Sequence, residues 1–152
     1  MKKIFVLVSI FTIACINTYA QQNEAELIRS AFRLDKKAKV AAFMHLPDSS
    51  AEKFWPIYNK YEAERTAIGD RRIKMLEKYA SVYDKLDPVT AEKLWKESAA
   101  IQKAEVALRE RYASLVKKSV SAIAGFNFFM VEDYIATAVK NELYTAIPTT
   151  PL

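Results

Sequence analysis

The chain has very little cysteine, glycine or histidine. Its 152 residues include one cysteine (Cys15), two glycines and one histidine (His45). A lone cysteine excludes an intramolecular disulfide. Two glycines are too few for the glycine-rich loops that hold phosphates or expose a nucleophile. One histidine cannot supply the several nitrogen ligands of a usual protein metal site. These shortages argue against nucleotide-binding, hydrolytic and histidine-rich metal sites.

Residues 1–20 have the pattern of an export signal. Two lysines precede a run of about ten apolar residues, and Thr18-Tyr19-Ala20 then places small residues where a signal peptidase cleaves. The run is shorter than the roughly twenty apolar residues that span a bilayer. We expect cleavage after Ala20 and a periplasmic location. The alternative is a lipoprotein acylated at Cys15, which would be attached to the membrane.

The charge balance and the common residue types indicate an all-α protein. The net charge is +5, with 23 basic and 18 acidic residues, and removal of the two leader lysines leaves 21 against 18, a net charge of +3. This charge is small and interspersed, so it does not predict nucleic-acid binding. Alanine, glutamate, lysine and leucine are abundant, as is typical of helices.

A repeat divides the sequence into helices. Leu46-Pro-Asp-Ser-Ser-Ala-Glu-Lys-Phe-Trp55 recurs as Leu86-Asp-Pro-Val-Thr-Ala-Glu-Lys-Leu-Trp95. Each copy opens a run with apolar residues at helical spacing, so the sequence predicts a long antiparallel hairpin over about 49–86 and 88–122. Further helices are expected over 24–46 and about 126–144, with Ala124-Gly125 as a break between the third and fourth. The resulting prediction is a single four-helix domain over 21–147, elongated and dimeric, with a loose tail over 148–152.

The helix ends also carry local signals. Ser49 and Glu52 have the spacing of a capping box, which predicts that Ser49 caps the second helix. Pro56 follows closely and is expected to bend this helix or delay its regular part by a turn. Asp87 and Pro88 predict an N-cap followed by proline at the first position of the third helix.

The hairpin stripe contains tyrosines and arginines where a dimerising coiled coil would place aliphatic residues. One interpretation is a partly open amphipathic surface that binds polypeptides, since both residue types combine apolar area with a polar group. The candidate binding residues are Tyr58, Tyr61, Arg65, Arg72, Tyr79 and Tyr112. The other interpretation is that Arg65 or Arg72 pairs with Glu105 across the hairpin while tyrosines fill the core.

Catalytic and metal sites are not predicted. Glu132 and Asp133 are adjacent, so on a helix they point about 100° apart and do not converge. We expect them to face solvent or pair with an arginine across the hairpin. His45 has only Asp48 and Glu52 as nearby candidate ligands, and its place in the last turn of a helix favours helix-end packing. No cofactor is implied.

The repeat and the C-terminal part resemble known exported proteins. Leu46 and Leu86 match the leading leucines of the twice-occurring L-T-x-x-Q motif of the Spy/CpxP group, although Pro47 and Asp87 replace its threonine, and Ser50 and Thr90 replace its glutamine. Residues 128–135, then Leu143 and Ile147-Pro148, resemble the ending of uncharacterised exported proteins close to that group.

The resemblance implies an elongated helical hairpin that dimerises into a shallow cradle. Spy-like proteins are ATP-independent chaperones, and CpxP-like proteins restrain an envelope-stress sensor kinase. Metal-sensing relatives use histidine-rich sites, which this sequence lacks.

We therefore expect an exported, non-enzymatic protein that binds unfolded segments or the extracytoplasmic domain of a sensor, as a chaperone or stress adaptor. The alternative is a regulator of an extracytoplasmic sigma-factor or sensor-kinase system, responsive to metal or another signal. A dimeric envelope protein without clients is a third, purely structural hypothesis.

Overall fold

The computed structural model describes residues 35–145, which form an all-α structure with no strand in that range. A helix over 35–44 precedes α2 (Asp48–Ala80), the short 3-10 helix η1 (Tyr83–Lys85), α3 (Pro88–Ser119) and α4 (Ala122–Thr145). The expected leader, the first part of the predicted 24–46 helix and the tail lie outside the described residues. The chain divides into two compact units between Ala42 and Phe43, and the second unit contains α2, α3 and α4.

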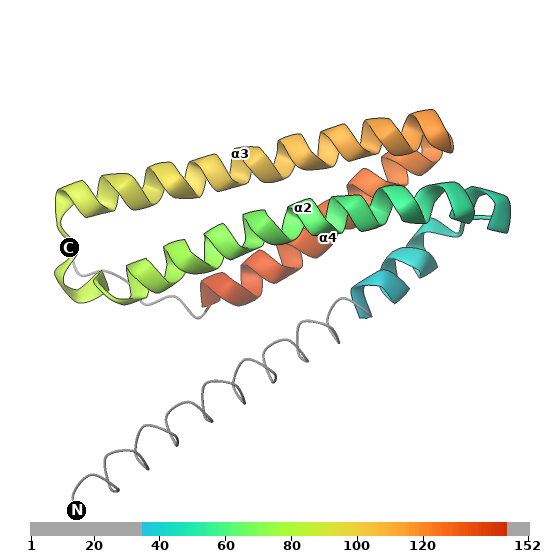
Figure 1. Ribbon diagram of the computed structural model, residues 1–152. Helices are drawn as coiled ribbons and strands as arrows, with labels where there is room; N and C mark the ends of the chain where they lie inside the picture. Colours follow the sequence, from blue (N-terminus) through green and yellow to red (C-terminus); the bar gives the residue numbers. More distant parts are fainter. Residues whose placement is uncertain (1–34, 146–152) are drawn as a thin grey trace, which may run out of the picture. The chain divides into compact units, whose positions relative to one another are not determined.

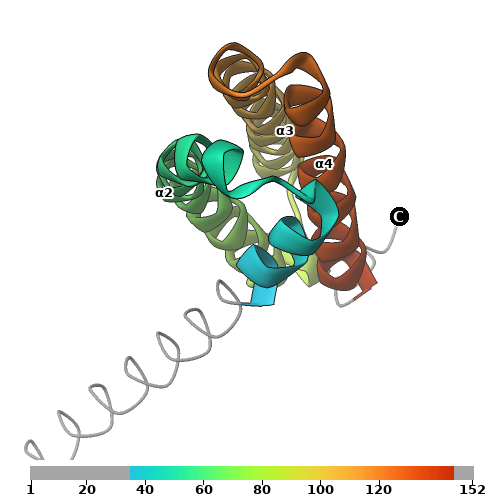
Figure 2. The ribbon, with the colours of Figure 1, turned by 90° about the vertical axis from the view of Figure 1, so that its right-hand side faces the viewer.

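The second unit is built on a helical hairpin. α2 and α3 run antiparallel, joined by the turn that contains η1, and α4 returns alongside α3 (Figures 1 and 2). α3 packs against both α2 and α4. The predicted all-α fold with a short-turn hairpin is therefore confirmed. The two long helices lie antiparallel because the turn between them is short.

The start of α2 differs from the prediction. The helix begins at Asp48, one residue before Ser49, and Pro47 occupies the N-cap position without a side-chain cap. The Pro47 carbonyl accepts hydrogen bonds from the amides of Ser50 and Ala51, both at 2.9 Å, so the backbone itself closes the first turn. The helix continues unbroken through Pro56, so the expected delay is wrong.

The hairpin turn shortens α2 relative to the predicted end at residue 86. The amide of Ser81 donates to the Glu77 carbonyl at 3.0 Å, and the amide of Val82 donates to the nearer Tyr79 carbonyl at 3.0 Å. This change to a three-residue spacing tightens the chain into η1 and ends the α-helix at Ala80. The predicted start of α3 is confirmed: the Asp87 carboxylate accepts from the Thr90 amide at 2.9 Å, and Pro88 is the first helical residue.

Gly125 lies inside α4, which begins at Ala122, so the predicted break before residue 126 is wrong. A Cβ at Gly125 would lie 2.8 Å from the Ala113 carbonyl oxygen and 2.9 Å from the Lys117 Cβ. The glycine therefore permits a close approach of α4 to α3 instead of ending a helix.

The core of the hairpin unit is aromatic. Phe128 of α4 is fully buried, and its ring centroid lies 5.0 Å from that of Tyr61, 6.3 Å from that of Phe54 and 6.4 Å from that of Tyr58. Edge-to-face arrangements such as these stabilise aromatic cores beyond the apolar area they bury. The other buried apolar residues of these three helices are Ile101, Leu108, Tyr112, Val116, Ala124 and Val131.

The two tryptophans mark opposite ends of the hairpin, because each opens its own helix and the helices are antiparallel. Trp55 packs against Phe54 and Tyr58, with centroids 5.0 and 5.5 Å away. Trp95 is 62% exposed, and the Lys96 ammonium lies 6.0 Å from its ring centroid. The core is therefore concentrated at the end where α2 and α4 begin.

Candidate functional site

The predicted polypeptide-binding residues do not form an open surface. Tyr58, Tyr61, Arg72 and Tyr112 are each at most 4% exposed, and Arg65 and Tyr79 are half-buried. The expectation of a partly open tyrosine–arginine surface is wrong for the four buried residues, because the closed hairpin and α4 cover them. Their side chains instead form three polar clusters inside the unit.

The first cluster surrounds Arg72. Its guanidinium donates to a carboxylate oxygen of Glu105 at 2.8 Å and to the Tyr144 hydroxyl at 3.2 Å, and the Lys140 ammonium lies 3.7 Å from the same carboxylate. The cluster therefore ties α2, α3 and α4 together. The alternative sequence interpretation, an arginine paired with Glu105 across the hairpin, is confirmed for Arg72.

Arg65 instead pairs within its own helix. Its guanidinium donates to the two carboxylate oxygens of Glu62 at 2.8 and 3.3 Å. Burial lowers the pKa of Arg65, but the Glu62 carboxylate more than compensates, so the pKa is raised and the charge is maintained. Arg65 is thus held beside the second cluster, not aimed at solvent.

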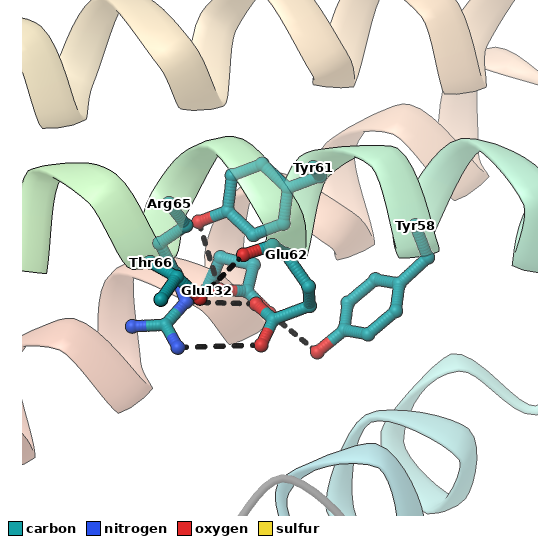
Figure 3. Close-up of polar contacts among 6 residues, drawn as sticks. All are labelled: Tyr58, Tyr61, Glu62, Arg65, Thr66 and Glu132. Carbon is teal, nitrogen blue, oxygen red and sulfur yellow. Dashed lines mark hydrogen bonds and ion pairs between the residues drawn. The ribbon is translucent and has the colours of Figure 1, made fainter.

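The second cluster surrounds Glu132, whose carboxylate is buried between α4 and α2. The Tyr58 hydroxyl donates to one oxygen at 3.1 Å, and the Tyr61 hydroxyl donates to the other at 2.9 Å (Figure 3). Glu132 is 1% exposed, so the expectation that it faces solvent is wrong. Arg65 lies near enough for the Glu132 carboxylate to raise its pKa. Glu132 lies one helical turn after Phe128 and shares the buried face of α4 with it.

The tyrosines of this cluster are held in the neutral form. Burial, followed by the negative charge of Glu132, raises the pKa of Tyr58 and of Tyr61 far above the ordinary tyrosine value. Neither hydroxyl can therefore act as a base near neutral pH. The two hydroxyl–carboxylate hydrogen bonds join α2 to α4 inside the core.

Asp133 behaves as expected from the sequence and pairs with an arginine. Its carboxylate lies 2.9 Å from a guanidinium nitrogen of Arg109 on α3. The Arg109 side chain is 5% exposed, and its guanidinium lies 5.6 Å from the ring centroid of Phe129. Its buried Nε has no hydrogen-bond partner in the described part of the chain.

The third cluster joins α2 to α3 through Glu64. The Tyr112 hydroxyl donates to one carboxylate oxygen of Glu64 at 2.6 Å, and Arg111 donates to the other. These two hydrogen bonds lower the pKa of Glu64. Burial and the bond to Glu64 raise the pKa of Tyr112. The polar end of Tyr112 is thus occupied within the hairpin.

A groove between α3 and α4 has a volume of about 470 Å³. Phe126 and Phe129 supply its aromatic surface. Its lining residues are Glu110, Ala113, Ser114 and Lys117 of α3, and Ala122, Gly125, Phe126 and Phe129 of α4. The sequence does not predict the groove, because its lining residues come from two helices whose packing it does not specify.

The outer face of α4 carries exposed apolar side chains at helical spacing, here called the α4 stripe. It consists of Ile123 (74% exposed), Phe126 (63%), Met130 (44%) and Tyr134 (75%). α4 is also the one helix within 35–145 whose length and composition would allow it to cross a membrane, a test that core helices of soluble proteins pass as well. The stripe shares Phe126 with the groove.

The region around His45 does not form a metal-binding cluster. His45 is exposed, follows the end of the 35–44 helix, and has a positive φ of 43°, so it lies outside the last turn where it was expected. Within residues 35–145, no group of three or more histidine, cysteine, aspartate or glutamate side chains is placed to hold a metal ion.

Comparison with known proteins finds no matching family model, no similar curated protein and no similar solved structure.

Proposed function

We propose that this chain is an exported, non-enzymatic protein that binds exposed segments of other polypeptides, as a chaperone or an envelope-stress adaptor. The α3–α4 groove is the observation that supports this proposal. Residues of both helices line it, and its volume of about 470 Å³ can accept large apolar side chains. The proposal keeps the function expected from the sequence but moves the binding surface from the hairpin stripe to the groove.

The chemistry of the groove suits a polypeptide segment. The aromatic rings of Phe126 and Phe129 offer apolar contact, while Ser114, Lys117 and Glu110 provide hydrogen-bonding groups at the same site. Aromatic surface bordered by polar side chains is typical of protein-binding patches. A client with an apolar side chain followed by polar backbone could use both kinds of contact.

The proposal is tested by aggregation of a reduced, unfolding client. The wild-type protein is expected to suppress light scattering at an equimolar ratio. Ser114→Trp would fill the groove from α3, and we expect it to weaken client binding about tenfold or more, which corresponds to roughly 1.4 kcal/mol. Ala100→Trp introduces the same side chain at another exposed position of α3 and serves as the matched control.

Two results would contradict the proposal. One is a wild-type protein that leaves aggregation unchanged at equimolar ratio. The other is equal activity of Ser114→Trp and wild type, with both shown to be folded by circular dichroism.

A further inference from the structure

We infer that the α3–α4 groove takes an amphipathic client helix that carries an acidic side chain at one end of its apolar face and a basic side chain at the other. The inference rests on the proposed function, because it names the kind of polypeptide that the groove binds. It is carried by Glu110 and Lys117, the two charged residues among the eight that line the groove.

Both charges are available to a partner. Glu110 and Lys117 are exposed, and within residues 35–145 neither side chain takes part in an ion pair or a hydrogen bond. The neighbouring Arg109 is already paired with Asp133 on α4, at 2.9 Å. The free charge that lines the groove is therefore negative at Glu110 and positive at Lys117.

The two charges lie on the same side of α3. They are seven positions apart, which is about two helical turns and roughly 10 Å along the helix axis. A partner helix repeats the side chains of one face at the same interval, so its residues i and i+7 can meet both charges. Its residues i+3 and i+4 then lie between the charges, where the rings of Phe126 and Phe129 offer apolar contact.

The walls of the groove favour a helical client over an extended one. Both walls are helices, and residues 35–145 contain no strand whose edge could pair with an extended backbone. An extended segment would bring unpaired amide and carbonyl groups against aromatic side chains, which is unfavourable. A helix satisfies these groups internally and presents its side chains to the groove.

The charge pattern determines which helices bind best. A helix with one glutamate and one lysine seven positions apart can place the glutamate near Lys117 and the lysine near Glu110. A helix with two glutamates or two lysines at these positions meets one attractive and one repulsive charge. Because exposed ion pairs contribute modestly, the expected preference for the mixed helix is about fivefold in the dissociation constant.

Fluorescence anisotropy with synthetic helical peptides tests the inference. Three alanine-rich peptides of about eighteen residues share leucines at i+3 and i+4 and carry Glu/Lys, Glu/Glu or Lys/Lys at i and i+7. The full-length wild type should bind the Glu/Lys peptide about fivefold more tightly than the other two at low salt, and the preference should vanish near 1 M salt. Glu110→Lys should prefer the Glu/Glu peptide, and Lys117→Glu should prefer the Lys/Lys peptide.

Control variants separate the groove from the net charge of the protein. Glu77→Lys and Lys78→Glu make the same charge changes at exposed positions of α2 and should keep the wild-type preference. Ser114→Trp should weaken the binding of the Glu/Lys peptide about tenfold or more, because it fills the groove. A Glu/Lys peptide with a central proline cannot continue its helix and should also bind about tenfold more weakly.

The inference is overturned if the wild type binds the three peptides equally, if the two groove charge variants keep the wild-type preference, or if the proline peptide binds as tightly as its helical parent. Suppression of client aggregation that Ser114→Trp abolishes would then leave the proposed function standing. A wild type that neither binds a peptide nor suppresses aggregation removes both. Self-association lost in Ser114→Trp, without peptide binding, would make a second copy the occupant and overturn the inference.

Discussion

Replacement of Glu132 by methionine should destabilise the protein substantially. The two tyrosine hydroxyls that donate to its carboxylate at 3.1 and 2.9 Å would lose this acceptor inside the core. Hydrogen bonds to charged groups contribute about 1.5–3 kcal/mol each to stability. Burial of the apolar methionine side chain returns about 1.5–3 kcal/mol, so the expected net loss in the free energy of unfolding is centred on roughly 2 kcal/mol.

The same reasoning predicts a partial rescue. Tyr58→Phe and Tyr61→Phe remove the two hydroxyls that Glu132→Met deprives of their acceptor. Replacing all partners of a buried hydrogen bond by apolar groups costs far less than replacing one. The triple variant is therefore expected to be at least ~1 kcal/mol more stable than Glu132→Met alone.

Urea unfolding followed by circular dichroism measures both effects as changes in the midpoint at a constant slope. Glu142→Met is the control, because Glu142 is an exposed glutamate on the same helix and should change stability by less than ~0.5 kcal/mol. The reasoning would be refuted by a Glu132→Met variant as stable as wild type. It would also be refuted by a triple variant less stable than the single one.

Three other perturbations test separate parts of the structure. Gly125→Ala should destabilise the protein by about 1–3 kcal/mol, because the new Cβ would lie 2.8 Å from a backbone oxygen of α3. Gly69→Ala, whose Cβ would have no atom within 4 Å, should stabilise the protein by about 0.5–1 kcal/mol. Thermal unfolding compares the two variants. Asp87→Ala should lower the melting temperature at pH 7 and have little effect near pH 2. Hydrogen bonds from Thr90 lower the pKa of Asp87 in the folded protein. The stability that Asp87 contributes is therefore present above the ordinary aspartate pKa and is lost as the pH falls through the lowered value. Above about pH 10, where an unfolded tyrosine ionises, the stability of the protein should fall as the pH rises, because burial and then Glu132 raise the pKa of Tyr58 and of Tyr61 in the folded state. The double variant Tyr58→Phe, Tyr61→Phe should show a shallower decline. Equal declines of the two proteins in urea titrations would contradict this.

The local signal at Asp87 and Pro88 predicted local structure correctly, whereas the signals at Ser49, Pro56 and Gly125 did not. Asp87 and Pro88 determine the start of α3 through contacts within four residues, and the helical spacing of apolar residues determined the all-α class. The predicted end of α2 was wrong, because Val82 and Leu86 continue the apolar spacing although the α-helix ends before both, at Ala80. Periodicity reports which side chains could share a face and does not report where the backbone turns.

The candidate site depended on contacts that the sequence does not encode locally. In the sequence, Glu132 resembles a surface residue beside Asp133. Its burial is explained by hydrogen bonds from Tyr61 and Tyr58, which precede it by 71 and 74 positions. Gly125 reads as a helix break, but its role follows from the carbonyl of Ala113 on another helix. Tyr58, Tyr61 and Tyr112 stand out among the stripe residues of the sequence, but their burial against Glu132 and Glu64 follows from how the three helices pack.

The Glu132 cluster also has a consequence for the order of folding. The α2–α3 hairpin closes through a turn of a few residues, which costs little chain entropy, whereas the bonds from Tyr58 and Tyr61 to Glu132 close loops of more than seventy residues. The hairpin should therefore form early, and α4 should dock on it late. Loss of Glu132 would then mainly accelerate unfolding and leave the folding rate nearly unchanged, so that this buried carboxylate governs how long the folded protein lasts more than how fast it forms.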